Sequence, residues 1–187
     1  SVGKPYSSLS TVIDILREKD ALPYTIVVDS TSSTSVGQQY LGPYTACMLG
    51  EYFMYRGKDV LVIFDDLTKH AWTYRQISLL LERAPGREAY PGDIFYVHSQ
   101  LMERAAYLKP ELKGGSMTFF PIIETLQGDL TSYIPNNIIS MTDGQIYFNS
   151  DLFYKGIKPA IDFGLSVSRI GNKAQWEAMR KSSKDVR

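Results

Sequence analysis

The chain has 187 residues, a length that predicts one domain, and its 44% hydrophobic and 21% charged residues are typical of a globular protein. Twenty basic side chains balance twenty acidic ones, so bulk electrostatic attraction to nucleic acid or to a membrane surface is not expected. A single cysteine excludes a disulfide framework, and two histidines argue against a histidine-built metal site. The longest aliphatic runs, of about five residues, exclude a transmembrane helix. Because the first residue is serine, we expect a piece of a longer chain.

The first half of the chain predicts alternating helices and strands. Ser7 or Ser8 could cap a helix whose apolar positions continue to Leu16, and the β-branched run at 24–28 predicts a buried strand. After a polar loop at 30–37, an apolar and tyrosine-rich face predicts a helix over 40–52 that stops near Gly57. Residues 60–64 predict a second buried strand, followed by a helix over 71–82.

The second half begins with a loop rich in proline and glycine at 84–92. Asp93 is expected to cap a helix over 94–108 that includes Ala105 and Leu108. Strands are expected at 117–123, 138–140 and 144–148. Helix and strand alternate through residue 123, which predicts an α/β fold with a parallel sheet flanked by helices.

The strongest local signal for chemistry is Val60-Leu-Val-Ile-Phe-Asp65-Asp66. An apolar strand that ends in aspartate describes a Walker B motif, in which the carboxylate holds Mg²⁺ or its water beside a nucleotide phosphate. Buried strands also commonly end at an acidic residue with no such role, and taken alone the motif favours that structural explanation. The complete Walker A pattern does not occur in these residues, since Gly3-Lys4 is followed by Pro5.

Longer strings then identify a family. Three strings follow one another in the second half of the chain: RAPGREAYPGD at 83–93, TDGQIYF at 142–148 and LFYKGIKPAIDFGLSVSRIG at 152–171. Upstream of them, the chain contains GEYF at 50–53, FDDLTK at 64–69 and YRQISLLL at 74–81. All of these strings occur in the order that one family shows. From Ser1 to about Met179 the chain resembles the alpha subunit of the rotary F-type ATP synthase. The resemblance implies a RecA-like P-loop NTPase core, with a mostly parallel sheet flanked by helices, that lacks the N-terminal Walker A portion. It implies that residues 1–171 are the C-terminal two thirds of the nucleotide-binding domain and that 172–187 begin a helical C-terminal region.

The resemblance also assigns roles to individual residues. Asp65 matches the Walker B aspartate, expected to hold Mg²⁺ through water, and Asp66 matches the acidic residue after it. Lys158 and Pro159 match an Arg-Pro pair near the adenine, with lysine here in place of arginine. Arg169, in Ser166-Val-Ser-Arg169, matches the arginine that reaches into the catalytic site of the beta subunit. The implied cofactor of the intact subunit is Mg-ATP or Mg-ADP.

The implied partners are beta subunits, which alternate with alpha subunits in a hexameric ring, and a central gamma-like shaft surrounded by loop 84–92. Without the resemblance, that loop would be interpreted as an ordinary turn between helices. The implied location is peripheral to an energy-transducing membrane, either the mitochondrial inner membrane or the bacterial plasma membrane, on the matrix or cytoplasmic side. Neither nucleic-acid binding nor direct membrane insertion is expected.

Some positions depart from the family pattern. Alpha subunits usually read Ser-Ile-Gly-Gln-Lys-Arg where this chain reads Ser1-Val-Gly-Lys4-Pro5-Tyr6, and beta subunits carry their catalytic glutamate at the place of Lys4. Trp72 and Gln100 also replace the usual residues, which indicates a divergent alpha subunit. We therefore expect a non-catalytic subunit. The alternatives are an alpha-like subunit of a specialised ATP-hydrolysing motor, or a scaffold domain without nucleotide binding.

Three features have plain structural interpretations. His70 and His98 have no second ligand at metal spacing and are expected to be surface or partly packed residues. Cys47 is expected to be a small buried hydrophobe. The segment 172–187 carries five basic and two acidic residues, and it predicts a solvated helix, or an entry into another domain, rather than a basic tail for an anionic partner.

Overall fold

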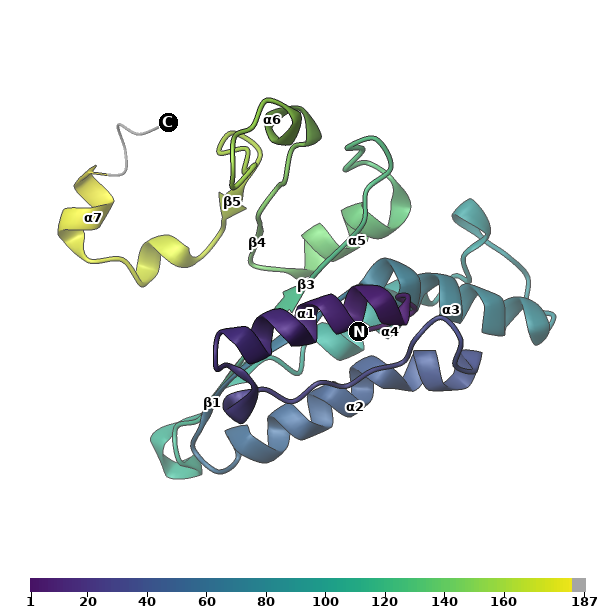
Figure 1. Cartoon of the computed structure of the whole chain (residues 1–187), viewed down its shortest axis with the longest axis horizontal. Helices are drawn as coiled ribbons and strands as arrows, with labels where there is room; N and C mark the ends of the chain where they lie inside the picture. The colour runs from purple at the N-terminus through teal and green to yellow at the C-terminus, as the bar shows by residue number, and fades with distance from the viewer. Residues whose placement is uncertain (183–187) are drawn as a thin grey trace. The chain divides into compact units, whose positions relative to one another are not determined.

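The computed structural model describes residues 1–182 and divides the chain into two compact units, Ser1–Glu124 and Thr125 onward (Figure 1). Residues 183–187, the end of the predicted C-terminal region, lie outside the described residues. The elements of the first unit are α1 (Tyr6–Glu18), η1 (Leu22–Tyr24), α2 (Val36–Met54), β1 (Asp59–Phe64), α3 (Leu67–Leu80), η2 (Arg87–Ala89), α4 (Ile94–Met102), β2 (Ala106–Tyr107), η3 (Pro110–Leu112) and β3 (Ser116–Pro121).

The first unit is built on a three-stranded sheet in the order β1-β3-β2. β1 and β3 are parallel from Asp59 opposite Ser116 to Phe64 opposite Pro121, whereas β2 pairs antiparallel with β3. The α/β class is therefore confirmed, and the described sheet is mixed.

One face of β1 is buried and the other is exposed. Val62 and Phe64 are buried, and α2 packs against β1, while Leu61 and Ile63 are each more than half exposed. The prediction of a fully buried strand is thus wrong for half of its side chains, because helices of this unit cover one face only. A strand that is apolar on both faces is typical of a sheet covered on both sides.

Helix α2 begins at a capping box and ends against β3. The Ser35 hydroxyl accepts from the Gln38 N–H, and the Gln38 side chain accepts from the Ser35 N–H, which pairs two N–H groups that the first turn leaves free. At the other end, a Cβ on Gly115 would overlap the carbonyl oxygen of Met54. Glycine at 115 therefore allows the last turn of α2 to approach β3.

A buried pair of histidines joins α3 to α4. His70 and His98 are both fully buried, and His70 Nδ1 lies 3.4 Å from His98 Nε2. His70 Nε2 lies 3.1 Å from the Tyr40 carbonyl oxygen, which can only accept, so Nε2 carries the proton and Nδ1 accepts from His98. The prediction of surface or partly packed histidines is wrong, because this mutual hydrogen bond lets two neutral rings enter the core.

Burial determines the protonation of these groups. It lowers the pKa of His70 to about 4 and the pKa of His98 to about 3. Cys47 is fully buried, as predicted, and burial raises the pKa of its thiol to about 12. None of the three carries charge near neutral pH.

The second unit contains short elements and a small antiparallel pair. β4 (Gly144–Gln145) pairs with β5 (Val167–Ser168), and Phe148 forms an isolated bridge with Ile161. The helices are α5 (Tyr133–Met141), α6 (Ser150–Tyr154), η4 (Gly171–Lys173) and α7 (Glu177–Ser182). No helix within residues 1–182 is both long and apolar enough to span a membrane.

Two predicted strands are wrong. Residues 24–28 form no strand: Tyr24 ends η1, and Ile26 and Val27 are exposed. Residues 138–140 lie inside α5, where Ile134 and Ile138 are buried four residues apart. Burial of that helical face outweighs the strand preference of the isoleucines.

Three boundaries also differ from the predictions. α3 begins at Leu67 rather than Ala71, α4 ends at Met102 rather than near Leu108, and β4 covers only the first two residues of the strand expected at 144–148. Asp93 precedes α4 but makes no side-chain cap. Its carboxylate instead accepts hydrogen bonds from Tyr74 and Arg83.

Candidate functional site

Three carboxylates lie near the C-terminal ends of the parallel strands β1 and β3. Asp65 and Asp66 follow β1 directly, and Glu124 follows β3 by three residues. The ends are joined by backbone hydrogen bonds, since the Ile122 N–H donates to Phe64 and the Leu67 N–H donates to Ile122. The Glu124 N–H also donates to the Thr68 hydroxyl at 2.9 Å. Ligands of open α/β sheets bind at this edge.

The two aspartates have different environments. Asp65 is 42% exposed at its side chain, whereas the Asp66 side chain is fully buried. Asp66 Oδ1 accepts from the Lys69 N–H at 2.7 Å and so caps α3. Asp66 therefore has a structural role in this chain, and its Oδ2 faces Lys4.

Two lysines face the three carboxylates, and we call these five residues the charged cluster. Lys4 Nζ lies 3.1 Å from Asp65 Oδ1, 3.0 Å from Asp66 Oδ2 and 3.1 Å from Glu124 Oε1. Lys69 contacts Glu124 closely and lies 3.9 Å from Asp66 Oδ2. The cluster thus holds three negative and two positive groups.

The charges of the cluster shift one another's protonation. Burial alone would lower the pKa of Lys4, but its contacts with Asp66, Glu124 and Asp65 outweigh burial and raise the pKa above its usual value. The hydrogen bond from Lys69, with further help from Lys4, lowers the pKa of Glu124 to about 2. Burial raises the pKa of Asp66, and the Lys69 N–H and Lys4 oppose that shift. Lys4 is therefore an ammonium at any physiological pH.

The oxygen donors suit a hard cation such as Mg²⁺, which uses few protein carboxylates and retains several waters. Asp65 and Glu124 are both partly exposed, but each oxygen of Glu124 faces a lysine, and Asp66 is buried and engaged with Lys69 and Lys4. Within residues 1–182 no group of three or more His, Cys, Asp or Glu side chains has the arrangement of a metal site. These residues fit a metal held by one carboxylate and by a ligand's phosphates, rather than an all-protein cage.

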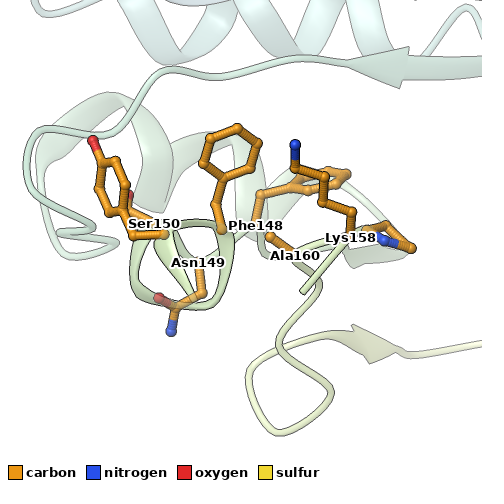
Figure 2. Close-up of a pocket in the computed structure, with 8 residues that line it drawn as sticks. Phe148, Asn149, Ser150, Lys158 and Ala160 are labelled. Carbon is orange, nitrogen blue, oxygen red and sulfur yellow. The ribbon is translucent and has the colours of Figure 1, made fainter. Parts of the chain in front are cut away.

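A cavity of about 500 Å³ lies in the second unit, between α6 and the segment 158–160. Its lining combines aromatic rings with one cation, and consists of Phe148, Asn149, Ser150, Phe153, Tyr154, Lys158, Pro159 and Ala160. Figure 2 shows the Phe148 ring and the Lys158 side chain extending to the same side, while Asn149 points away. Lys158 Nζ lies 4.9 Å from the centre of the Phe153 ring. Aromatic faces beside a cation can stack on a planar base.

The fold of this segment is fixed by hydrogen bonds. The Asn149 side chain accepts from the Asp151 N–H at 2.8 Å and caps α6, and the Asn149 N–H donates to the Ala160 carbonyl at 2.8 Å. Residues 158–160 are thereby held beside the start of α6. The structure thus places Lys158 and Pro159 together on one cavity wall.

Arg169 directly follows β5. Its N–H donates to the Asp143 carbonyl at 2.7 Å, which fixes the backbone, and its guanidinium is 3.4 Å from the Ser140 carbonyl oxygen. The side chain is exposed, and within the described part of the chain it forms no ion pair with a carboxylate. Its guanidinium can therefore make a new contact without breaking an ion pair of the described part of the chain.

Loop 84–92 joins α3 to α4 and is braced at its base (Figure 1). Arg83 Nη2 lies 2.8 Å from Asp93 Oδ2, and the Tyr74 hydroxyl donates to the same oxygen at 2.7 Å. Within the loop, the Arg75 guanidinium lies 4.7 Å from the centre of the buried Tyr90 ring. The loop is thus contacted by Tyr74 and Arg75 of α3 and by Arg83 just beyond it.

Analysis of the sequence named Asp65 and Asp66 as site residues and noted that Lys4 stands at the position of the catalytic glutamate of beta subunits. It did not name Glu124 or Lys69. The available signal was position: Glu124 follows the predicted strand 117–123 just as Asp65 follows 60–64. Parallel strands end at the same sheet edge, so both acids could have been expected there.

Comparison with known proteins agrees with this geometry. Residues 1–168 match the model of the ATP synthase alpha/beta family, nucleotide-binding domain. Proteins named ATP synthase subunit alpha are similar to the chain, at 57% identity in Caldanaerobacter subterraneus subsp. tengcongensis and 56% in Dehalococcoides mccartyi, each over 97% of this chain. The protein of that name in Clostridium kluyveri is 54% identical over the full chain. The chain spans 36–37% of the length of these relatives. The resemblance found in the sequence is confirmed, and the chain belongs to the ATP synthase alpha/beta family.

Proposed function

We propose that the chain is part of a non-catalytic alpha subunit of a rotary ATP synthase or ATPase. The observation that carries the proposal is identity above 50%, over nearly the whole chain, to proteins named ATP synthase subunit alpha. In this proposal residues 1–171 belong to the nucleotide-binding domain, and 172–187 begin a helical region.

The nucleotide would be Mg-ATP or Mg-ADP. Asp65 is a partly exposed carboxylate of the charged cluster and would hold Mg²⁺ through water, with Asp66 behind it. Lys158 and Pro159 would lie near the adenine, which is supported by the aromatic lining of their cavity. Bound Mg²⁺ would supply neutralisation of phosphate charge, and the chain's own residues would orient the nucleotide.

Lack of hydrolysis in this subunit is supported by the surroundings of Lys4. Activating an attacking water requires a group that can accept a proton, usually a carboxylate. Lys4 is an ammonium whose pKa is raised, so it cannot accept that proton. The three neighbouring carboxylates are already paired with Lys4 or Lys69.

Arg169 would act in a neighbouring beta subunit as an arginine finger. A guanidinium presents a planar fork of donors to the charge that develops on transferred phosphoryl oxygens. The fixed backbone and exposed side chain of Arg169 support such a reach. Without this role, Arg169 would form surface contacts worth about 0–1 kcal/mol.

Loop 84–92 would contact a central gamma-like shaft. The support comes from its braced base and from the exposed Leu80 and Leu81 at the adjoining end of α3. Beta subunits would alternate with this subunit in a hexameric ring, peripheral to an energy-transducing membrane on its matrix or cytoplasmic side. Neither nucleic acid nor direct membrane insertion has a part in the proposal.

The test is steady-state ATPase activity of assembled complexes that carry Arg169→Lys or Arg169→Ala. An arginine finger supplied by a neighbouring subunit raises the rate of phosphoryl transfer by roughly 10³–10⁵. Both variants should therefore be strongly impaired. Arg169→Lys is included because lysine keeps the charge but lacks the planar fork of donors. Arg17→Lys and Arg17→Ala are matched controls, since Arg17 is an exposed arginine of α1 that pairs with Asp14.

Assembly is checked by subunit composition. Near-normal turnover of a correctly assembled Arg169→Ala complex would refute the finger. Absence of bound nucleotide in the intact wild-type subunit would instead favour the scaffold alternative.

A further inference from the structure

Lys4 occupies a position in the charged cluster that resembles that of a bound cation. Its Nζ is almost equidistant from one oxygen of each carboxylate, at 3.1 Å from Asp65, 3.0 Å from Asp66 and 3.1 Å from Glu124. Its side chain is only 22% exposed, so its stem is packed and its charged end is directed inward. Asp66 Oδ2 is buried and faces this ammonium.

The remaining contacts leave few oxygens for a metal. Asp66 Oδ1 is taken by the Lys69 N–H, and Glu124 Oε2 is taken by Lys69 Nζ. Asp65 and Glu124 both reach solvent, with side chains 42% and 46% exposed, but each oxygen of Glu124 faces a lysine, whereas Lys4 contacts Asp65 through Oδ1. With Lys4 in place, the cluster carries one net negative charge. Without Lys4, the three carboxylates and Lys69 would carry a net charge of two negative, and three carboxylate oxygens would converge on a site without a cation.

We propose that Lys4 is a tethered cation that keeps divalent metal out of the charged cluster until a phosphate-bearing ligand brings the metal with it. This role of Lys4 rests on the proposed nucleotide-binding function. A divalent ion approaching the free cluster meets the Lys4 ammonium about where it would contact the carboxylates, and the repulsion between like charges opposes its binding. Phosphate oxygens supply the negative charge that offsets this repulsion, leaving Asp65 to contribute through water.

The probe is Mn²⁺ alone, titrated into the nucleotide-free full protein and followed by electron paramagnetic resonance. Lys4→Gln removes the charge while installing the residue usual at this place in alpha subunits, and Lys4→Arg keeps the charge. We expect Lys4→Gln to bind Mn²⁺ about tenfold to thirtyfold more tightly than the wild type, whereas Lys4→Arg stays near it. Lys109→Gln, a lysine outside the cluster, is the matched control and should not change the affinity.

Equal Mn²⁺ affinity in the wild type and Lys4→Gln would overturn the proposal, as would an equal increase in Lys109→Gln. If Lys4→Gln fails to fold by circular dichroism, Lys4→Met supplies a second neutral side chain for the same comparison. A separate ADP titration distinguishes the two levels of inference. Failure of wild type and variants alike to bind ADP refutes the proposed function, while the Mn²⁺ comparison still decides the role of Lys4.

Discussion

Lowering the pH from 7 to 5 should destabilise the fold through the buried pair His70 and His98. Burial lowers their pKa values to about 4 and about 3, so both remain neutral in the folded chain at pH 5. In the unfolded chain their pKa is about 6.5, and both become protonated. The unfolded state then binds more protons, so stability is present above about pH 6.5 and is lost as the pH falls towards the folded values.

The size of the effect follows from the unfolded pKa. Between pH 6.5 and 5, each buried histidine that stays neutral lowers the free energy of unfolding by about 2 kcal/mol, at 1.36 kcal/mol per pH unit. The pair therefore lowers it by about 4 kcal/mol. Glu124, with its pKa lowered to about 2, does not titrate in this window. His70 and His98 therefore dominate the expected change.

The measurement is urea unfolding of the full protein at pH 7 and pH 5. His98→Gln keeps a donor where Nε2 donates to His70 but cannot titrate, so it should remove about half of the pH-dependent loss. A wild-type free energy of unfolding that is equal at the two pH values would refute this reasoning. So would an undiminished loss in His98→Gln.

Other predictions test the remaining features. Asp65→Ala should weaken nucleotide retention in the intact subunit, measured by the nucleotide that stays bound after gel filtration, and unchanged retention would remove Asp65 from the metal site. The pure intact subunit, free of beta, should show no multiple-turnover ATPase activity, and sustained turnover would contradict the role given to Lys4. Gly115→Ala should lower the free energy of unfolding by about 2 kcal/mol through overlap with Met54, whereas Gly92→Ala, where a Cβ meets nothing within 4 Å, should change it little. Asp93→Asn should loosen loop 84–92, seen as faster amide hydrogen exchange there, and unchanged exchange would show that the brace is dispensable.

Elements with one consistent local signal could be predicted from the sequence. β1, followed by Asp65 and Asp66, and α2 were both predicted, and both are present. The buried face of α2 was not predicted, since Leu41, Met48 and Tyr52 are each more than half exposed. α3 could have been started correctly, because Asp66 is a favourable N-cap residue three positions before Lys69. The predicted start at Ala71 followed the apolar run and ignored the cap.

The errors occur where contacts between distant residues outweigh local preference. Isoleucines at 138 and 139 favour a strand in isolation, yet burial of one face of α5 makes them helical. The two histidines lie 28 residues apart, and nothing in their spacing shows that they would satisfy each other inside the core. Lys4 and Glu124 are likewise separated by 120 positions, so their pairing appears only when the strands are assembled.

Helix α3 connects two regions that are otherwise separate along the chain. Its first turn is fixed by Asp66 in the charged cluster, while Tyr74 in its middle and Arg83, three residues past its end, hold Asp93 at the base of loop 84–92. Fourteen residues make a rod of about 21 Å, too stiff to compress along its axis. A displacement of α3 along its axis would therefore move the contacts at the charged cluster and at the base of loop 84–92 together. A force on the loop and a change of charge in the cluster would both act on this one helix.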